Sequence, residues 1–215
     1  MVANEKWFGG AGATAGFYDY QISQSARFDH TSQSYMQLSD SSVSGNRRYF
    51  TFSVWLKKSL LADSTYTHHG IIGAGNSGLS DTGGTSSTIL GLSFNDDSLF
   101  VNSQTTNMSY QTGFKFRDVG GWYHIVMSGN NGTGILYVNG TQYDSFSFDG
   151  GADTAWNNRY MVIGTRRVST AGYYFGGYMA ELIMISHSTS AGVLTPTSFA
   201  EDHKGIWRPK DISGL

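Results

Sequence analysis

Residues 49–58 read YFTFSVWLKK, an alternation of large apolar side chains with mostly smaller or polar ones. Successive side chains of a β-strand point to opposite faces, so the alternation divides the stretch into two sets. One face carries Phe50, Phe52, Val54 and Leu56, and the opposite face carries Thr51, Ser53, Trp55 and Lys57. The stretch therefore predicts a half-buried strand whose phenylalanine face belongs to a core.

Further strand-like runs surround this stretch at short intervals. They cover residues 69–74, 88–94, 98–103, 122–128, 134–138, 142–148, 160–164 and 177–186. Asn95-Asp96-Asp97 lies between two runs, and Asn139-Gly140 offers the positive φ angles that a type I′ turn requires. We therefore expect an all-β sandwich in which sequential strands pair antiparallel.

The length of 215 residues suits one large β-domain, with a single core expected over residues 26–205. Residues 1–25 contain WFGGAGATAG and predict a Gly/Ala-rich arm, because they have too few large apolar groups for a core. Residues 206–215 are expected to form a tail. One short C-terminal helix is predicted, because Thr195 can cap it, Pro196 suits its first position and residues 197–202 can complete it.

The composition excludes several kinds of partner. A net charge of −2 and a pI near 6.3 provide no basic field for a phosphate backbone, so no nucleic-acid partner is expected. No run approaches the roughly 20 apolar residues of a membrane helix, so no membrane insertion is expected. The absence of cysteine excludes disulfides and thiolate zinc sites.

Several segments together resemble a group of marine tailed-phage proteins. They are WFGGAGATAGFYDYQI, SARFDHTSQSYMQLS, GNRRYFTFSVWLKKS, WYHIVMS, GILYVNGTQ, YFGGYMAELIMIS and LTPTSFAEDHKGIWRPKDISG. Those proteins carry a concanavalin A-like lectin/glucanase domain that is related to laminin G-like domains. The resemblance implies a jelly-roll sandwich of two curved antiparallel sheets and a place on a virion. Residues 1–16 lack an apolar segment of signal-peptide length, so we expect synthesis in the host cytoplasm.

The leading hypothesis is a non-enzymatic virion surface protein, as capsid decoration or as a head- or tail-fibre subunit. It would contact other capsid or tail proteins, with host-surface glycan as a second kind of partner. The alternative is a carbohydrate-binding receptor-recognition module of a tail fibre, and a glycoside hydrolase ranks below both. The glucanase branch needs carboxylates in a pattern such as Glu-x-Asp-x-x-Glu, which is absent here. Glu181 has Ala180 and Leu182 beside it and predicts a hydrogen-bonded, semi-buried carboxylate that fixes a loop.

Calcium is the one cofactor that the resemblance brings into question, since laminin G-like and legume-lectin relatives often bind it through loop carboxylates. The loop candidates are Asp96, Asp97, Asp149 and Asp153. None of them has a recognisable calcium-loop spacing, and turn aspartates usually serve their own hydrogen bonds. Calcium binding and ordinary turn hydrogen bonds both remain as interpretations of these aspartates.

Aromatic and polar loop residues are the candidates for glycan contact. Tyr66, Trp156, Tyr173 and Tyr174 offer flat faces, and Asn157, Asn158 and Arg166 offer directional hydrogen bonds. Ordinary core or subunit contacts are the alternative for the same side chains.

The arm also carries large side chains. Trp7, Phe8, Phe17 and Tyr18 could anchor it to a neighbouring subunit, although a plain linker is the alternative. We expect a homo-oligomer, with a trimer as the first expectation. The short chain without shaft repeats favours decoration or a head fibre over a long tail fibre.

Overall fold

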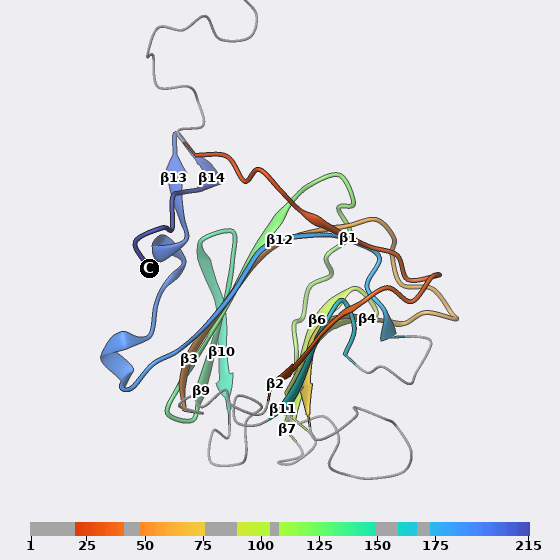
Figure 1. Cartoon of the computed structure of the whole chain (residues 1–215), viewed down its shortest axis with the longest axis horizontal. Coiled ribbons are helices and arrows are strands. Elements are labelled where there is room, and N and C mark those ends of the chain that lie inside the picture. The colour runs from red at the N-terminus through yellow and green to blue at the C-terminus, as the bar shows by residue number, and fades with distance from the viewer. Residues whose placement is uncertain (1–19, 41–47, 76–89, 104–107, 149–158, 167–172) are drawn as a thin grey trace, which may run out of the picture.

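Two six-stranded antiparallel sheets pack face to face in a computed structural model that describes residues 20–40, 48–75, 90–103, 108–148, 159–166 and 173–215 (Figure 1). Sheet A has the order β1 (Ala26–Phe28), β12 (Gly177–Ser186), β3 (Tyr49–Lys58), β8 (Tyr123–Asn130), β9 (Thr133–Val138) and β10 (Thr141–Ser147). Sheet B has the order β2 (Met36–Asp40), β11 (Arg159–Ile163), β4 (His68–Gly75), β5 (Leu90–Asn95), β6 (Ser98–Ser103) and β7 (Met108–Gln111). The predicted all-β sandwich is confirmed.

The C-terminal part adds a small third layer. β13 (Ala200–His203) and β14 (Ile206–Pro209) form a separate hairpin, preceded by the single 3₁₀ turns η2 (Ser190–Gly192) and η3 (Pro196–Ser198). Within the described ranges, no helical turn has the length and hydrophobicity needed to cross a membrane.

β3 organises sheet A, because it pairs with β12 on one side and with β8 on the other. Its predicted core face is confirmed, and the side chains of Phe50, Phe52, Val54 and Leu56 are almost fully buried. Sheet B contributes Ile72, Leu92, Phe94, Leu99 and Val101 to the same core. Burial of each such side chain stabilises the fold by about 1.5–3 kcal/mol, so this layer supplies much of the stability.

The opposite face of β3 was expected to be partly exposed, and this prediction is wrong for three of its four residues. Thr51, Ser53 and Trp55 are all buried. The C-terminal segment crosses this face, and the backbone N–H of Leu194 donates a 2.9 Å hydrogen bond to Thr51 Oγ1. The alternation of apolar and polar residues within β3 cannot predict that a segment more than a hundred residues later in the chain packs on its outer face.

The predicted strands agree with the observed ones to within two residues at each end. Both predicted turns are also confirmed, since Asp96, Asp97, Asn139 and Gly140 all have positive φ angles. The sequence did not predict β1, β2, β7, β13 and β14. These strands have three to five residues, too few for an alternation to stand out.

The predicted C-terminal helix is wrong in extent. Only Pro196–Ser198 forms a 3₁₀ turn, and Thr195 makes no side-chain hydrogen bond that caps it. From Ala200 the chain is extended and pairs with β14, because this brings Phe199 and Ala200 into buried positions. The boundary proposed between residues 205 and 206 therefore falls at the turn of a hairpin.

Candidate functional site

A groove crosses the outer face of sheet A where the N-terminal segment meets the C-terminal hairpin. It consists of two hollows of about 480 and 610 Å³ that share the side chains of Trp55, Trp122 and Trp207. Residues 20–25 border the first hollow, and Figure 1 shows this segment passing from the β13–β14 hairpin to β1. The Asn139-Gly140 turn borders the second hollow.

Trp55 lies at the base of this groove. Its side chain is 6% exposed and packs with Ala180, Ala200 and Ile22 in a small cluster outside the main core. Its indole Nε1–H is buried and meets no acceptor among the described residues. A buried donor of this kind is destabilising unless a bound molecule or water supplies an acceptor.

Trp207 is held in place by His124, which lies beneath it on β8. The indole Nε1–H of Trp207 donates a 2.9 Å hydrogen bond to His124 Nδ1. An indole N–H can only donate, so the neutral imidazole carries its proton on Nε2 and donates to Ser53 Oγ at 2.9 Å. The imidazole also stacks on Trp55, with ring centroids 4.5 Å apart. His124 therefore positions two of the three indoles.

Gly140 gives Trp207 the room to lie over the β9–β10 turn. A Cβ atom at Gly140 would lie 2.6 Å from the indole ring, and the φ angle of +82° also disfavours a side chain. Gly140 therefore meets two requirements: the positive φ angle of the turn and the space for the Trp207 indole.

Stability is expected to fall as the pH drops from about 6.5 towards 4. Burial lowers the pKa of His124 to about 4, and burial followed by the charge of Lys58 lowers the pKa of His69 to about 4. The unfolded chain binds these protons more readily, so the stabilisation is complete above pH 6.5 and is lost as the pH falls. Shifts of this size correspond to on the order of 3 kcal/mol per imidazole.

Urea unfolding midpoints between pH 7.5 and pH 4 measure this loss. His124→Gln should flatten the pH dependence, because it removes one of the two buried imidazoles. An unfolding midpoint that is constant over this range would contradict the buried, neutral state of both imidazoles.

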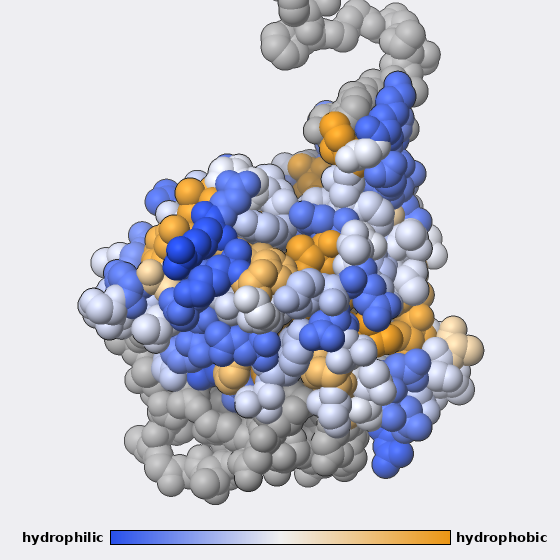
Figure 2. All heavy atoms as spheres, turned by 180° about the vertical axis from the view of Figure 1, so that it is seen from behind, coloured by the Kyte–Doolittle hydropathy of each residue, from blue (hydrophilic) through white to orange (hydrophobic). Residues whose placement is uncertain are grey.

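Trp122 is the most exposed indole of the groove, with 41% of its surface accessible. It directly precedes β8, which positions it beside the other two indoles. Polar side chains surround the three rings, namely Gln21, Gln24, Asn139 and Thr141. On the face drawn in Figure 2, the described apolar residues form separate patches among polar ones.

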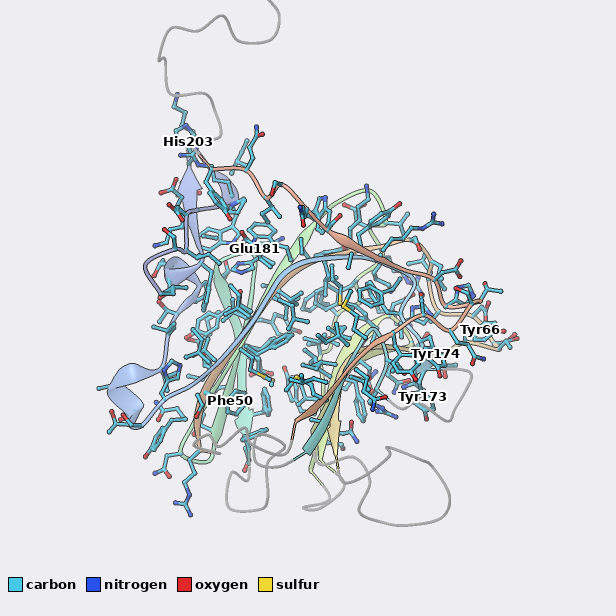
Figure 3. The ribbon with its side chains drawn as sticks, in the orientation of Figure 1. Phe50, Tyr66, Tyr173, Tyr174, Glu181 and His203 are labelled. Carbon is cyan, nitrogen blue, oxygen red and sulfur yellow. The ribbon has the colours of Figure 1, made fainter. Side chains whose placement is uncertain are left out.

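The aromatic candidates from the sequence lie elsewhere. Figure 3 shows Tyr66, Tyr173 and Tyr174 at one end of the sandwich, across the molecule from His203 on the hairpin. The Arg166 guanidinium lies 4.6 Å from the centroid of the Tyr173 ring and donates to Asn102 Oδ1 at 3.2 Å. The structure thus brings Arg166 and Tyr173 together.

These side chains are largely occupied by contacts within the chain. Arg166 and Tyr174 are almost fully buried, and the Tyr66 ring packs edge-on against His30. Trp156, Asn157 and Asn158 lie outside the described residues. Direct contacts within the chain therefore favour the alternative that these side chains serve ordinary packing. Their role in glycan contact stays a prediction.

The turn aspartates have partners of their own. Asp97 accepts a 2.5 Å hydrogen bond from the Lys58 ammonium and a 2.8 Å one from the Ala62 N–H. Burial tends to raise the pKa of Asp97, but these bonds outweigh it and hold the pKa below its usual value. Asp96 pairs with Lys115 at 2.6 Å.

Lys58 therefore provides the positive charge that a calcium ion would supply at Asp97. Among the described residues, no group of three or more His, Asp or Glu side chains could hold a metal ion. Asp149 and Asp153 lie outside those residues.

Glu181 is a semi-buried, hydrogen-bonded carboxylate, as the sequence predicted. It lies at a β-bulge with a φ angle of +46°, and the Tyr20 hydroxyl donates a 2.5 Å hydrogen bond to its Oε1. Burial raises the pKa of Glu181. The carboxylate holds the N-terminal segment beside the groove, whereas the sequence analysis expected it to fix a loop.

The Trp55–Trp122–Trp207 groove was not predicted. The alternation of residues 49–58 placed Trp55 on the outer face, which is the one signal that pointed there. Trp122 was counted as a strand residue and Trp207 as part of a tail, because no local pattern indicates that the hairpin folds back.

Comparison with solved structures identifies carbohydrate-related proteins with a similar fold. Domain 4 of AbnA, a GH43 extracellular arabinanase from Geobacillus stearothermophilus solved with arabinotriose, has 23% identity and a TM-score of 0.51. That match covers 78% of this chain and 73% of the other. A candidate carbohydrate-binding protein from Bacteroides ovatus has 16% identity and a TM-score of 0.50, with 80% of this chain and 48% of the other covered. At these identities the likeness concerns the fold.

Comparison at the level of sequence families gives the assignment. No curated protein matches the chain. A laminin G-like model, described as the concanavalin A-like lectin/glucanases superfamily, matches residues 30–192. This match covers well over half of the chain and includes most strands of both sheets. The chain therefore belongs to the concanavalin A-like lectin/glucanases superfamily.

Proposed function

We propose that this chain is a non-enzymatic, glycan-binding protein of a tailed-phage virion surface. The observation that carries the binding part is the convergence of Trp55, Trp122 and Trp207 on one groove. Sugar rings present apolar C–H faces that pack on aromatic rings, and hydroxyl groups that need hydrogen-bond partners. A groove with indoles and neutral polar residues offers both.

Each indole has a distinct part in this proposal. Trp122 is exposed and supplies the face on which a sugar ring stacks. Trp55 forms the base of the groove, where its ring is fixed by stacking on His124. Trp207 supplies a second wall, held by His124. The site is thus prepared before the ligand arrives, which limits the ordering entropy of binding.

The absence of the glucanase acid pattern supports a non-enzymatic role. The two glutamates in the described part of the chain are Glu181, whose Oε1 accepts a hydrogen bond from Tyr20, and Glu201, whose Oε1 accepts from Arg208. Purified protein incubated with polysaccharides should release no reducing ends. Clear turnover that is lost in Glu181→Gln would contradict this part of the proposal.

The virion location rests on the sequence resemblance to marine tailed-phage proteins. Labelled antibodies against this chain should decorate intact particles at the capsid or at a fibre. The predicted anchors of the arm, Trp7, Phe8, Phe17 and Tyr18, lie outside the described residues. Deletion of residues 1–19, the larger part of the predicted arm of residues 1–25, should prevent incorporation without unfolding the sandwich. Particles that lack the chain altogether would contradict the location.

The edge strand β2 favours assembly as a second part of this role. Met36 and Leu38 are each 50% exposed on β2, which is an outer strand of sheet B. Exposed apolar residues on an unpaired edge promote association with another chain, here a second copy.

Replacing both side chains of this edge by lysine is expected to convert oligomers to monomers. Light scattering at matched concentrations measures the change, and replacement of the exposed Val119 by lysine is the control. A wild-type protein that is monomeric at all concentrations would contradict assembly through β2.

The binding part is tested by a glycan array with the full chain. Selective binding is the expected result, and it should disappear in a variant of the groove but persist in a variant of the Arg166–Tyr173 cluster. Binding that is lost only in the Arg166–Tyr173 variant would move the site to the cluster that the sequence suggested. Binding to no glycan would contradict the lectin role and leave the structural one.

A further inference from the structure

We infer that the groove selects uncharged glycans and that Asp202 contributes to this selectivity. The inference rests on the proposed glycan binding and names the class of ligand. It follows from the placement of the charges that line the two hollows.

The charge of the first hollow is neutralised within the hairpin. Of the described residues that line it, Arg208 is the charged one. The guanidinium is almost fully buried, and its Nε and Nη2 atoms donate to Glu201 Oε1 at 3.0 and 2.7 Å. Glu201 lies directly opposite Arg208 in the β13–β14 pairing. A carboxylate on a ligand would have to compete with this internal pair.

The charge of the second hollow is negative and exposed. Asp202 is the charged residue among the described side chains that line it, and it lies directly opposite Trp207 in the β13–β14 pairing. Residues directly opposite each other in an antiparallel pair point to the same face, with Cβ atoms about 5 Å apart. The Asp202 carboxylate therefore lies beside the Trp207 indole.

Among the described residues, Asp202 has a hydrogen-bond partner but no ion-pair partner. Its Oδ1 accepts a 3.2 Å hydrogen bond from the Gly205 N–H. Within the described residues, no lysine, arginine or histidine lies within ion-pair distance of its carboxylate. The negative charge is thus open to a ligand that stacks on Trp207.

These charges disfavour acidic sugars. Proteins bind carboxylate and sulfate groups through charge-assisted hydrogen bonds from arginine or lysine. Here the arginine is occupied and the open charge is of the same sign as the ligand. Other polar side chains of the lining, among them Gln21, Gln24, Asn139 and Thr141, are uncharged and can form hydrogen bonds with hydroxyl groups. The chemistry matches chains of neutral hexoses or N-acetylated hexosamines.

Calorimetric titration of the full chain with size-matched oligosaccharides tests the class. Cellohexaose, mannohexaose and chitohexaose represent neutral ligands, and hexamers of alginate and heparin represent acidic ones. We expect at least one neutral hexamer to bind with little salt dependence, and both acidic hexamers to bind at least tenfold more weakly at low salt.

The variant Asp202→Asn tests whether Asp202 contributes to the selectivity against acidic glycans. Asparagine keeps an acceptor for the Gly205 N–H, so the turn should be retained, and thermal unfolding checks this. The variant should bind acidic hexamers roughly threefold more tightly at low salt, because surface charge interactions are of this size. The gain should vanish near 1 M salt, and affinity for neutral hexamers should not change. Asp202→Lys should give a larger gain.

Asp63→Asn is the matched control, because Asp63 is also an exposed turn aspartate that accepts backbone N–H groups, outside the lining of the groove. Equal or tighter binding of acidic hexamers by the wild type would overturn the selectivity and leave glycan binding intact. No effect of Asp202→Asn or Asp202→Lys would remove Asp202 from the selectivity. Binding of neither class would instead overturn the proposed function itself.

Discussion

Replacing Trp122 by alanine is expected to weaken glycan binding at least tenfold while changing the free energy of unfolding by no more than about 1 kcal/mol. The indole is 41% exposed, so its removal opens no cavity in the core. An aromatic anchor of a binding site typically contributes more than 1 kcal/mol to affinity, and 1.4 kcal/mol corresponds to tenfold. Calorimetric titration with neutral hexasaccharides and urea unfolding measure the two quantities.

Tyr143 provides the matched control for Trp122. It is also 41% exposed, and it lies on β10 outside the lining of both hollows. Tyr143→Ala should leave affinity unchanged. Equal losses in the two variants would mean that exposed aromatic surface in general, and not this groove, accounts for binding.

The largest effect on stability is expected for Asp97→Asn, which should lower the free energy of unfolding by about 3–5 kcal/mol. Lys58 is fully buried, and its ammonium also donates to the Phe116 carbonyl and lies 4.6 Å from the centroid of the Phe94 ring. Without the Asp97 carboxylate its charge would be buried without a countercharge of comparable strength. The urea midpoint measures the loss.

The neighbouring pair of Asp96 and Lys115 serves as the control for this prediction. Its contact distance of 2.6 Å is nearly the same, but both side chains are exposed. Exposed pairs contribute about 0–1 kcal/mol, so Asp96→Asn should have little effect. Similar losses for the two variants would show that burial is not the cause. Added calcium should not restore Asp97→Asn, because the lost partner of Lys58 is a negative charge.

Much of the sandwich followed from local patterns in the sequence. The alternation of residues 49–58 predicted the core face of β3, because neighbouring side chains on a strand must diverge. The Asp96-Asp97 and Asn139-Gly140 turns predicted two hairpins, because few residues adopt positive φ angles without strain. The absence of a Glu-x-Asp-x-x-Glu pattern argued against glucanase chemistry, because such a pattern lies within one strand and can be read directly from the sequence. Short strands and the extended C-terminal segment escaped prediction, because three to five residues hold too little pattern.

The groove depended on tertiary structure alone. Trp55, Trp122 and Trp207 come from a central strand, a loop and a hairpin that was taken for a tail, and chain separations of this size leave no local signal. The internal partners of Arg166 and Asp97 likewise became visible only in the folded chain, since the sequence around a loop residue does not show whether its partner is a ligand or another side chain. The sequence by itself determined most of the longer strands, two of the turns and the core face of β3. Only the tertiary structure decided what covers the outer face of β3, because this depends on which segments distant in the sequence pack on it and bury its side chains.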